Sequence, residues 1–260
     1  MMMRKSLSIF AVLLAISSLF ACKKSSTPDN NTAQMSMRLT DDPANYDAVY
    51  VDIQKIGFTM EGQSEIMLTP NRPGVYNLLS FRNGLDTLLV NAAIPVGTIG
   101  QIRLVLGNNN SVVVSGVSYP LSTPSAQESG LKLNFQTAIA ANVAYTIWMD
   151  FDAGKSIIQT GGGNYKLKPV IRAYSALTNG EISGSVLPTL AFATVYAING
   201  TDTAAAIPSS TDGHFVINGL ASGSYQLVVS PAVTTYLSYS TSVNVAYGVI
   251  TNVGTITLHP

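Results

Sequence analysis

The chain of 260 residues contains only one cysteine, two histidines and one tryptophan, and 11% of its residues are charged. A single cysteine cannot form a disulfide within the chain. His214 and His259 have no cysteine or histidine neighbour at metal-ligand spacing, and no G-x-S-x-G motif occurs. These absences argue against a zinc site and against a serine or cysteine hydrolase. We therefore expect a protein that is not an enzyme and has no cofactor.

Basic residues are also scarce. The chain has 14 Lys and Arg against 14 Asp and Glu, and residues 173–260 contain neither Lys nor Arg. A nucleic-acid interface needs a basic face, so we expect no nucleic-acid partner. The change in composition falls near residues 178–181, TNGE, whose Asn-Gly pair predicts a turn. We therefore predict two domains, at 35–177 and 178–260.

The lone cysteine follows an apolar N-terminal segment. Residues 1–5 include Arg4 and Lys5, and residues 6–21 are apolar with small residues interleaved. This order is typical of a signal peptide, here predicted at 1–21, and the run is too short to favour a membrane span. Residues 19–22, LFAC, resemble the lipobox of bacterial lipoproteins. That resemblance implies cleavage before Cys22 and a diacylglycerol on its sulfur. The alternative is an ordinary secretory signal with an incidental cysteine.

Residues 22–34 would then combine the lipid anchor with a tether. The segment after Cys22, KKSSTPDNNTAQ, has no apolar period, which is typical of a flexible linker. The predicted location is the cell envelope, as an outer-membrane lipoprotein whose membrane partner is reached through Cys22. The periplasmic and surface faces both remain open.

Strand-like alternation extends through both predicted domains. In residues 131–136, LKLNFQ, apolar and polar side chains alternate, and residues 48–53 and 100–107 show the same pattern. A period of two with one polar face indicates half-buried antiparallel strands. After residue 178 the expected strands are shorter and separated by turn signals such as Asp212-Gly213. We predict an all-β protein with two β-sandwich-like domains.

Two family resemblances accompany these patterns. Residues 37–53, MRLTDDPANYDAVYVDI, resemble the start of a bacterial lipoprotein family described as domain of unknown function 4382, and the resemblance covers residues 36–174. It implies an envelope lipoprotein without an agreed activity. Residues 210–231, STDGHFVINGLASGSYQLVVSP, resemble carboxypeptidase regulatory-like domains. That second resemblance implies a prealbumin-like sandwich of the carbohydrate-binding-like fold group, which accompanies other domains without catalysing a reaction.

The candidate ligand site lies in residues 145–155, YTIWMDFDAGK. Strand alternation places Trp148, Asp150 and Asp152 on one face of the expected strand. An exposed indole beside two carboxylates suits a sugar, which offers an apolar ring face and hydroxyl donors. The same carboxylates, together with Asp41 and Asp42, could instead bind Ca²⁺, which prefers several oxygen ligands.

Both groups of acids also have a structural interpretation. Residues 166–174, KLKPVIRAY, are expected to place Lys166, Lys168 and Arg172 on one strand face. If that strand neighbours residues 145–152, the aspartates pair with these bases, and Trp148 covers their alkyl stems or lies under the other domain. Residues 39–47, LTDDPANYD, can likewise be a turn whose aspartates accept hydrogen bonds from backbone amides.

The sequence thus predicts a lipid-anchored envelope protein that acts as a non-catalytic binding or adhesion module, with carbohydrate as the first ligand class. A scaffold that docks onto an envelope protein complex is the alternative. An enzyme that uses a pair of carboxylates is a third hypothesis.

Overall fold

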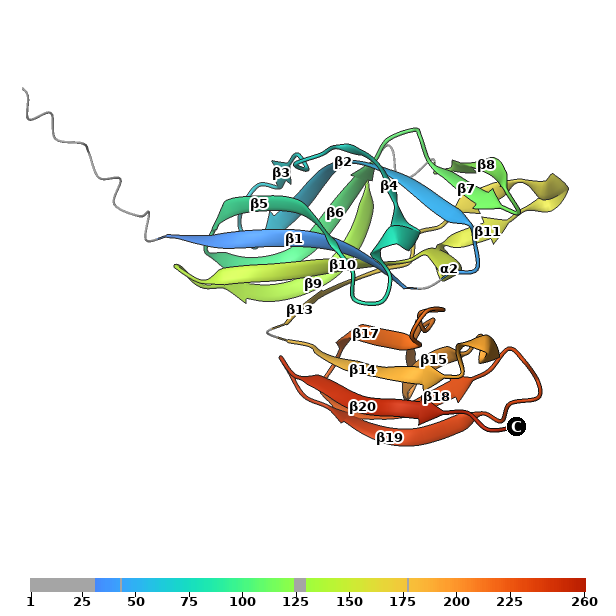
Figure 1. The fold of residues 1–260 in the computed structure, drawn as a ribbon. Helices are drawn as coiled ribbons and strands as arrows, with labels where there is room; N and C mark the ends of the chain where they lie inside the picture. Colours follow the sequence, from blue (N-terminus) through green and yellow to red (C-terminus); the bar gives the residue numbers. More distant parts are fainter. Residues whose placement is uncertain (1–30, 43, 124–129, 177) are drawn as a thin grey trace, which may run out of the picture. The chain divides into compact units, whose positions relative to one another are not determined.

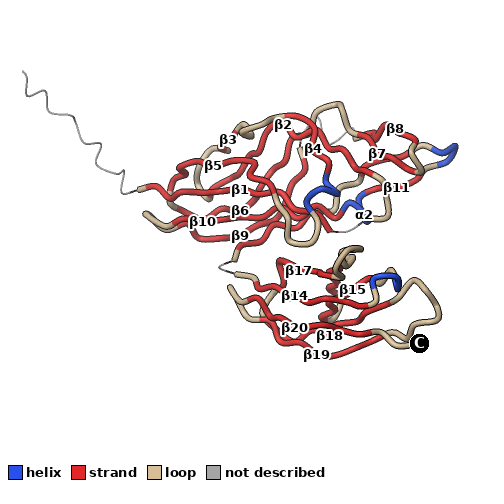
Figure 2. Tube along the Cα trace, viewed as in Figure 1, coloured by secondary structure: helices blue, strands red, loops and turns tan. Residues whose placement is uncertain are grey.

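The computed structural model describes residues 31–42, 44–123, 130–176 and 178–260, which are mostly strands (Figure 2). This confirms the all-β prediction. The predicted signal peptide, Cys22 and most of the predicted tether lie outside the described residues. Residues Asn31–Pro260 form one compact unit. Within the described part of the chain, no helix has the length and apolar character needed to cross a bilayer.

The first sandwich contains a four-stranded sheet (Figure 1). Its strands, in spatial order, are β13 (Ile171–Ser175), β10 (Ala144–Asp152), β1 (Thr32–Asp42) and β5 (Thr87–Pro95). Strands β1 and β10 pair in parallel, whereas β5 and β13 each run antiparallel to their neighbour. The parallel pair brings the end of β1 beside the end of β10, where the acidic residues of both strands lie.

A nine-stranded sheet faces it. Its main path is β11 (Ile157–Gln159), β12 (Tyr165–Leu167), β8 (Val117–Ser122), β7 (Ser111–Val114), β2 (Ala48–Met60), β6 (Gly97–Leu106) and β9 (Leu131–Ile139). Two further strands pair with β2: β3 (Ile66–Leu68) and β4 (Gly74–Asn77). The short helical segments of this sandwich are η1 (Leu78–Phe81), α2 (Ala153–Ser156) and η2 (Gly161–Gly163).

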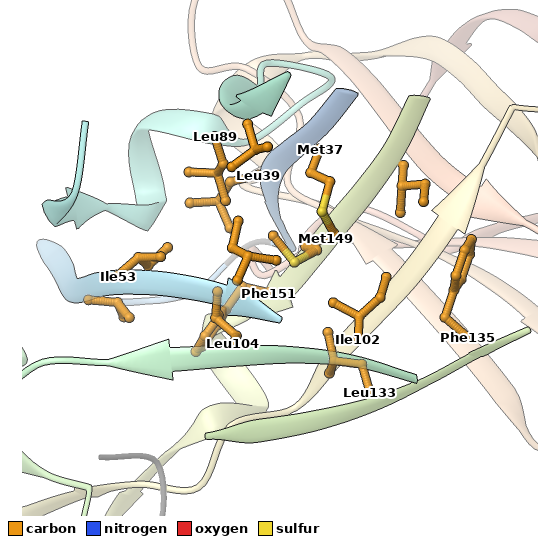
Figure 3. Packing of buried hydrophobic residues seen from close by; sticks show 14 of the residues in the cluster. Met37, Leu39, Ile53, Leu89, Ile102, Leu104, Leu133, Phe135, Met149 and Phe151 are labelled. Atoms are coloured by element: carbon orange, nitrogen blue, oxygen red, sulfur yellow. The ribbon is translucent and has the colours of Figure 1, made fainter. Parts of the chain in front are cut away.

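The two sheets bury their apolar faces against each other. In β9, Leu133 and Phe135 are buried whereas Lys132 and Asn134 are exposed, which confirms the alternation predicted from the sequence. Figure 3 shows side chains of both sheets meeting in this core. The labelled ones are Met37, Leu39, Leu89, Met149 and Phe151 from the four-stranded sheet, and Ile53, Ile102, Leu104, Leu133 and Phe135 from the other.

The second sandwich contains a three-stranded and a four-stranded sheet. The first sheet consists of β17 (His214–Leu220), β14 (Gly180–Leu187) and β20 (Ile250–Thr257). The other consists of β16 (Asp202–Ala206), β15 (Thr194–Asn199), β18 (Gly223–Ser230) and β19 (Tyr239–Val245), and η3 (Thr189–Ala191) precedes β15. These sheets enclose a second hydrophobic core, separate from the first. The division into two domains at 35–177 and 178–260 stays a prediction.

Residues 166–174 do not form the single strand that the sequence indicated. Lys166 lies in β12 of the nine-stranded sheet, whereas Arg172 lies in β13 of the four-stranded sheet. Pro169 stands between the two strands and has no N–H for a ladder hydrogen bond. The expectation that Lys166, Lys168 and Arg172 share one strand face was therefore wrong, and of the three only Arg172 lies in a strand paired with β10.

Candidate functional site

The predicted site residues Trp148, Asp150 and Asp152 lie on β10, on the face opposite to the core of the first sandwich. The parallel register of β1 places Asp42 beside Asp152. The antiparallel register of β13 places Arg172 beside Asp150. Carboxylates from two strands and a cation from a third therefore meet on one sheet face.

Each predicted carboxylate ligand on β10 already has a cationic partner. The guanidinium of Arg172 donates to Asp150 and, at 3.4 Å, to Asp42 Oδ2. Lys155 Nζ lies 2.7 Å from Asp152 Oδ2, and Asp152 Oδ1 accepts the backbone N–H of Lys155 at the start of α2. The Asp150 side chain is only 4% exposed, whereas Arg172 is 38% exposed. For Asp150, this is the cross-strand pairing that the structural interpretation of the sequence required.

Trp148 is held by contacts on its edge and on one ring face. Its indole Nε1 donates to Asp86 Oδ2 at 2.7 Å, and Asp86 Oδ1 lies 2.5 Å from the guanidinium of Arg38. The indole stacks on Tyr174 with ring centroids 5.6 Å apart and an interplanar angle of 11°. These contacts give Trp148 a packing role, and ligand binding by Trp148, Asp150 and Asp152 stays a prediction.

Asp41, Asp42 and Asp150 line a cavity of about 10 Å³, together with Thr40 and Asn83. This volume accommodates roughly one water molecule. Asp41 Oδ2, Asp150 Oδ1 and Asn83 Oδ1 are buried and have no hydrogen-bond partner among the described residues. The other oxygen of Asp41 accepts the N–H of Ala153 at 3.1 Å. Asp41 thus accepts a hydrogen bond from a backbone amide, as the turn interpretation expected. However, Asp41 lies near the end of β1, and the amide belongs to α2.

Burial changes the acidity of this cluster. It raises the pKa of Asp41 to about 9, and it raises the pKa of Asp42 to about 7 with a further contribution from the charge of Asp150. Burial also raises the pKa of Asp150, against the opposing effect of Arg172. Among the described residues, no three Asp, Glu, His or Cys side chains form a group that could hold a metal ion. The calcium hypothesis for Asp41 and Asp42 therefore gains no support from the geometry.

Sequence reasoning missed a pocket of about 290 Å³ that is lined mainly by the second sandwich. Its lining includes Phe192, Ile207 and Pro208 as apolar surfaces and the hydroxyl groups of Thr189, Ser209 and Ser210. Among the described residues, no charged side chain lines it. The sequence analysis could not find this pocket because the residues that form it come from separate turns.

Phe192 is the distinctive residue of this pocket. It is 64% exposed and has a left-handed backbone conformation, with φ of 45°. Such a conformation costs a non-glycine residue about 1–2 kcal/mol. The residue ends η3, and its N–H donates to the carbonyl of Thr189. A strained, exposed aromatic side chain at a pocket is a feature that often accompanies binding sites.

Comparison with known proteins identifies one family. The family described as "Domain of unknown function (DUF4382)" matches residues 32–169. No curated protein matches the chain.

Several solved structures resemble the chain weakly. The TIE protein of Bacillus anthracis is 10% identical over 88% of this chain and 35% of its own, with a TM-score of 0.25. The chain thus spans about a third of that protein. The minor pilin GBS52 of Streptococcus agalactiae is 12% identical over 86% of this chain and 95% of its own, with a TM-score of 0.24. A fimbrial protein of Bacteroides ovatus is 8% identical over 88% of this chain and 50% of its own, with a TM-score of 0.25. Similarities at this level carry no inference about function.

Proposed function

The chain belongs to the DUF4382 family, and from this premise we propose that it is a lipid-anchored protein of the cell envelope that acts as a non-catalytic binding or adhesion module. The family description itself names no activity. The anchor in this proposal is Cys22, and the binding surface is the second sandwich.

The surface composition of the second sandwich supports a binding role. Residues 178–260 contain no Lys or Arg and expose the aromatic side chains of Phe192, Tyr239 and Tyr247. Leu190 and Leu237 are also exposed there. Contact surfaces of proteins are enriched in aromatic residues and depleted in Lys, Glu and Asp. Exposed apolar groups on a domain with little charge therefore favour an interaction surface.

The uncharged pocket at Phe192 is the observation on which the ligand class rests. A neutral saccharide has apolar C–H faces, which stack on aromatic rings, and hydroxyl groups, which pair with Ser and Thr side chains. The described lining of the pocket offers both kinds of group and no charged side chain. Its volume of about 290 Å³ is near the lower end of the range of roughly 300–1,000 Å³ for ligand pockets. We therefore assign neutral carbohydrate as the ligand class.

Phe192→Ala should weaken binding of a neutral polysaccharide at least about tenfold, since losing a stacking surface of about 1.4 kcal/mol changes Kd by that factor. The purified protein would first be tested on a glycan panel, and calorimetry with the selected polysaccharide would then give Kd. Tyr247→Ala is the matched control, because Tyr247 is an exposed aromatic residue outside the pocket.

Trp148→Ala, measured in the same assay, distinguishes the pocket from the site predicted on β10. Loss of binding in Trp148→Ala but not in Phe192→Ala would place the ligand beside Asp150 and Asp152. Equal affinity in all three variants would contradict both sites. No saturable binding across the panel would remove the carbohydrate proposal altogether.

A scaffold that docks onto an envelope protein complex is the second candidate function. Strand β20 is an edge strand of the three-stranded sheet, and Ile250 at its start is exposed, as is the preceding Val249. An edge strand with exposed apolar side chains can pair with a strand of another protein. Crosslinks from β20 to an envelope protein, without glycan binding, would favour this function.

A further inference from the structure

Residues of the second sandwich close the acidic cavity on its second side. The residues of the second sandwich that line it are Ala205, Ala206, Val216 and Asn218, from β16 and β17. Opposite them lie the unpartnered oxygens of Asp41, Asp150 and Asn83. The cavity is too small for a solvent shell, so ionised carboxylates here would face three apolar side chains and the neutral amide of Asn218, with no cation among them.

When every acid is ionised, the negative charges around the cavity outnumber the positive charges. The acids are Asp41 and Asp42 on β1 and Asp150 and Asp152 on β10. The cations that act on them are Arg172 on β13, Lys155 on α2 and Arg82 after η1. Tyr174 on β13 is a further titratable neighbour. Burial raises its pKa, and Glu181 on β14 contributes in the same direction.

The second sandwich supplies no countercharge. Residues 173–260 contain no Lys or Arg, and neither Asp202 of β16 nor His214 of β17 lines the cavity. Neutralisation on that side must therefore come from protons on the carboxyl groups. A protonated carboxyl also has an O–H that can donate to a neighbouring unpartnered oxygen.

We infer that this cavity is a proton-dependent contact: protonated Asp41 and Asp42 hold the end of β1 against β16 and β17, and their ionisation weakens that contact. Because burial raises both pKa values, the contact is favoured at low pH and is lost as pH rises. Asp42 ionises first, near pH 7, and Asp41 follows near pH 9. Each proton released changes the contact equilibrium by up to about tenfold per pH unit.

The only tryptophan provides the signal to test this inference. Trp148 stacks on Tyr174, and a Cβ placed at Gly219 of β17 would lie 2.5 Å from Cδ1 of Tyr174. The Tyr174 ring is thus packed between the indole and the β17 backbone. Separation of β17 from this face would uncover the stack and increase access of a neutral quencher to the indole.

Acrylamide quenching of the purified full-length protein at pH 6 and pH 9 tests the contact. We expect the Stern–Volmer constant to rise at least twofold at pH 9, with an unchanged far-UV circular dichroism spectrum. The Asp41→Asn, Asp42→Asn double variant should show no rise, because its side chains cannot ionise. Asp42→Asn alone should leave a single transition near pH 9.

Asp47→Asn is the matched control, because Asp47 is exposed and accepts the N–H of Gly116 away from the cavity. It should behave like the unmodified protein. Equal quenching at both pH values would overturn the inference. So would a rise that persists in the double variant, or a loss of circular dichroism that parallels the rise in quenching.

Discussion

Arg172→Met should lower the free energy of unfolding at pH 7 by about 2–3 kcal/mol. The substitution keeps most of the apolar stem but leaves the buried carboxylate of Asp150 without its cation, and it also removes the partner of Asp42. Breaking a fully buried ion pair costs about 3–5 kcal/mol. Because Arg172 is 38% exposed, solvent screens part of the interaction, and we expect a smaller loss.

Urea denaturation followed by tryptophan fluorescence measures this loss directly. A double variant, Asp150→Asn with Arg172→Met, should recover at least half of it, because the more deeply buried of the two carboxylates that Arg172 contacts is then no longer charged. The loss should also shrink as the pH falls, since burial raises the pKa of Asp150 and a protonated Asp150 needs no cation. A change below about 0.5 kcal/mol in Arg172→Met would show that the pair behaves like an exposed surface ion pair.

The part of the site that the sequence predicted correctly depends on local periodicity. Alternation along residues 145–152 predicted that Trp148, Asp150 and Asp152 share one face, because successive side chains of a strand point to opposite sides. The burial of Met149 and Phe151 on the other face follows from the same pattern. The sequence also indicated the alternative in which Asp150 pairs with Arg172. That pairing required only that the strands carrying these two residues lie side by side in the sheet.

The rest of the site depends on contacts between distant segments. The parallel pairing of β1 with β10 brings Asp42 beside Asp152, and alternation within a strand does not specify which strand becomes its neighbour. The bond from Trp148 to Asp86 joins residues 62 positions apart in the chain. No pattern in the sequence indicates that partner. When the hydrogen bond to Asp86 is not known, the indole of Trp148 is expected to be exposed and free to bind a ligand.

Phe192 shows a different limit. The alternation of residues 192–198, FATVYAI, predicts a strand that begins at Phe192, but β15 begins at Thr194. The chain turns at Phe192 through a left-handed conformation, which sequence patterns associate with glycine and asparagine. A bulky residue in that conformation is disfavoured locally and must be supported by its surroundings. The pocket was therefore visible only once the turns around Phe192 were placed in space.

Cys22→Ser should move the protein almost completely from the membrane fraction to the soluble fraction. In our proposal the thioether of Cys22 carries the diacylglycerol, and serine has no thiol to accept it. Each buried CH₂ group contributes about 0.8 kcal/mol to membrane binding, so two or three acyl chains anchor firmly. Losing them removes the anchoring energy in one step. Fractionation and metabolic labelling with an alkyne fatty acid would measure partition and acylation together.

Ser25→Ala is the matched control, because it changes a hydroxyl three residues further along the predicted tether and keeps the cysteine. It should remain labelled and bound to the membrane. Labelled protein that stays in the membrane after Cys22→Ser would mean that another residue carries the lipid. Unlabelled protein that is soluble even with Cys22 intact would establish the ordinary secretory signal instead. In that case a binding module built on the second sandwich would act in solution, and its ligand would no longer be restricted to the vicinity of a membrane.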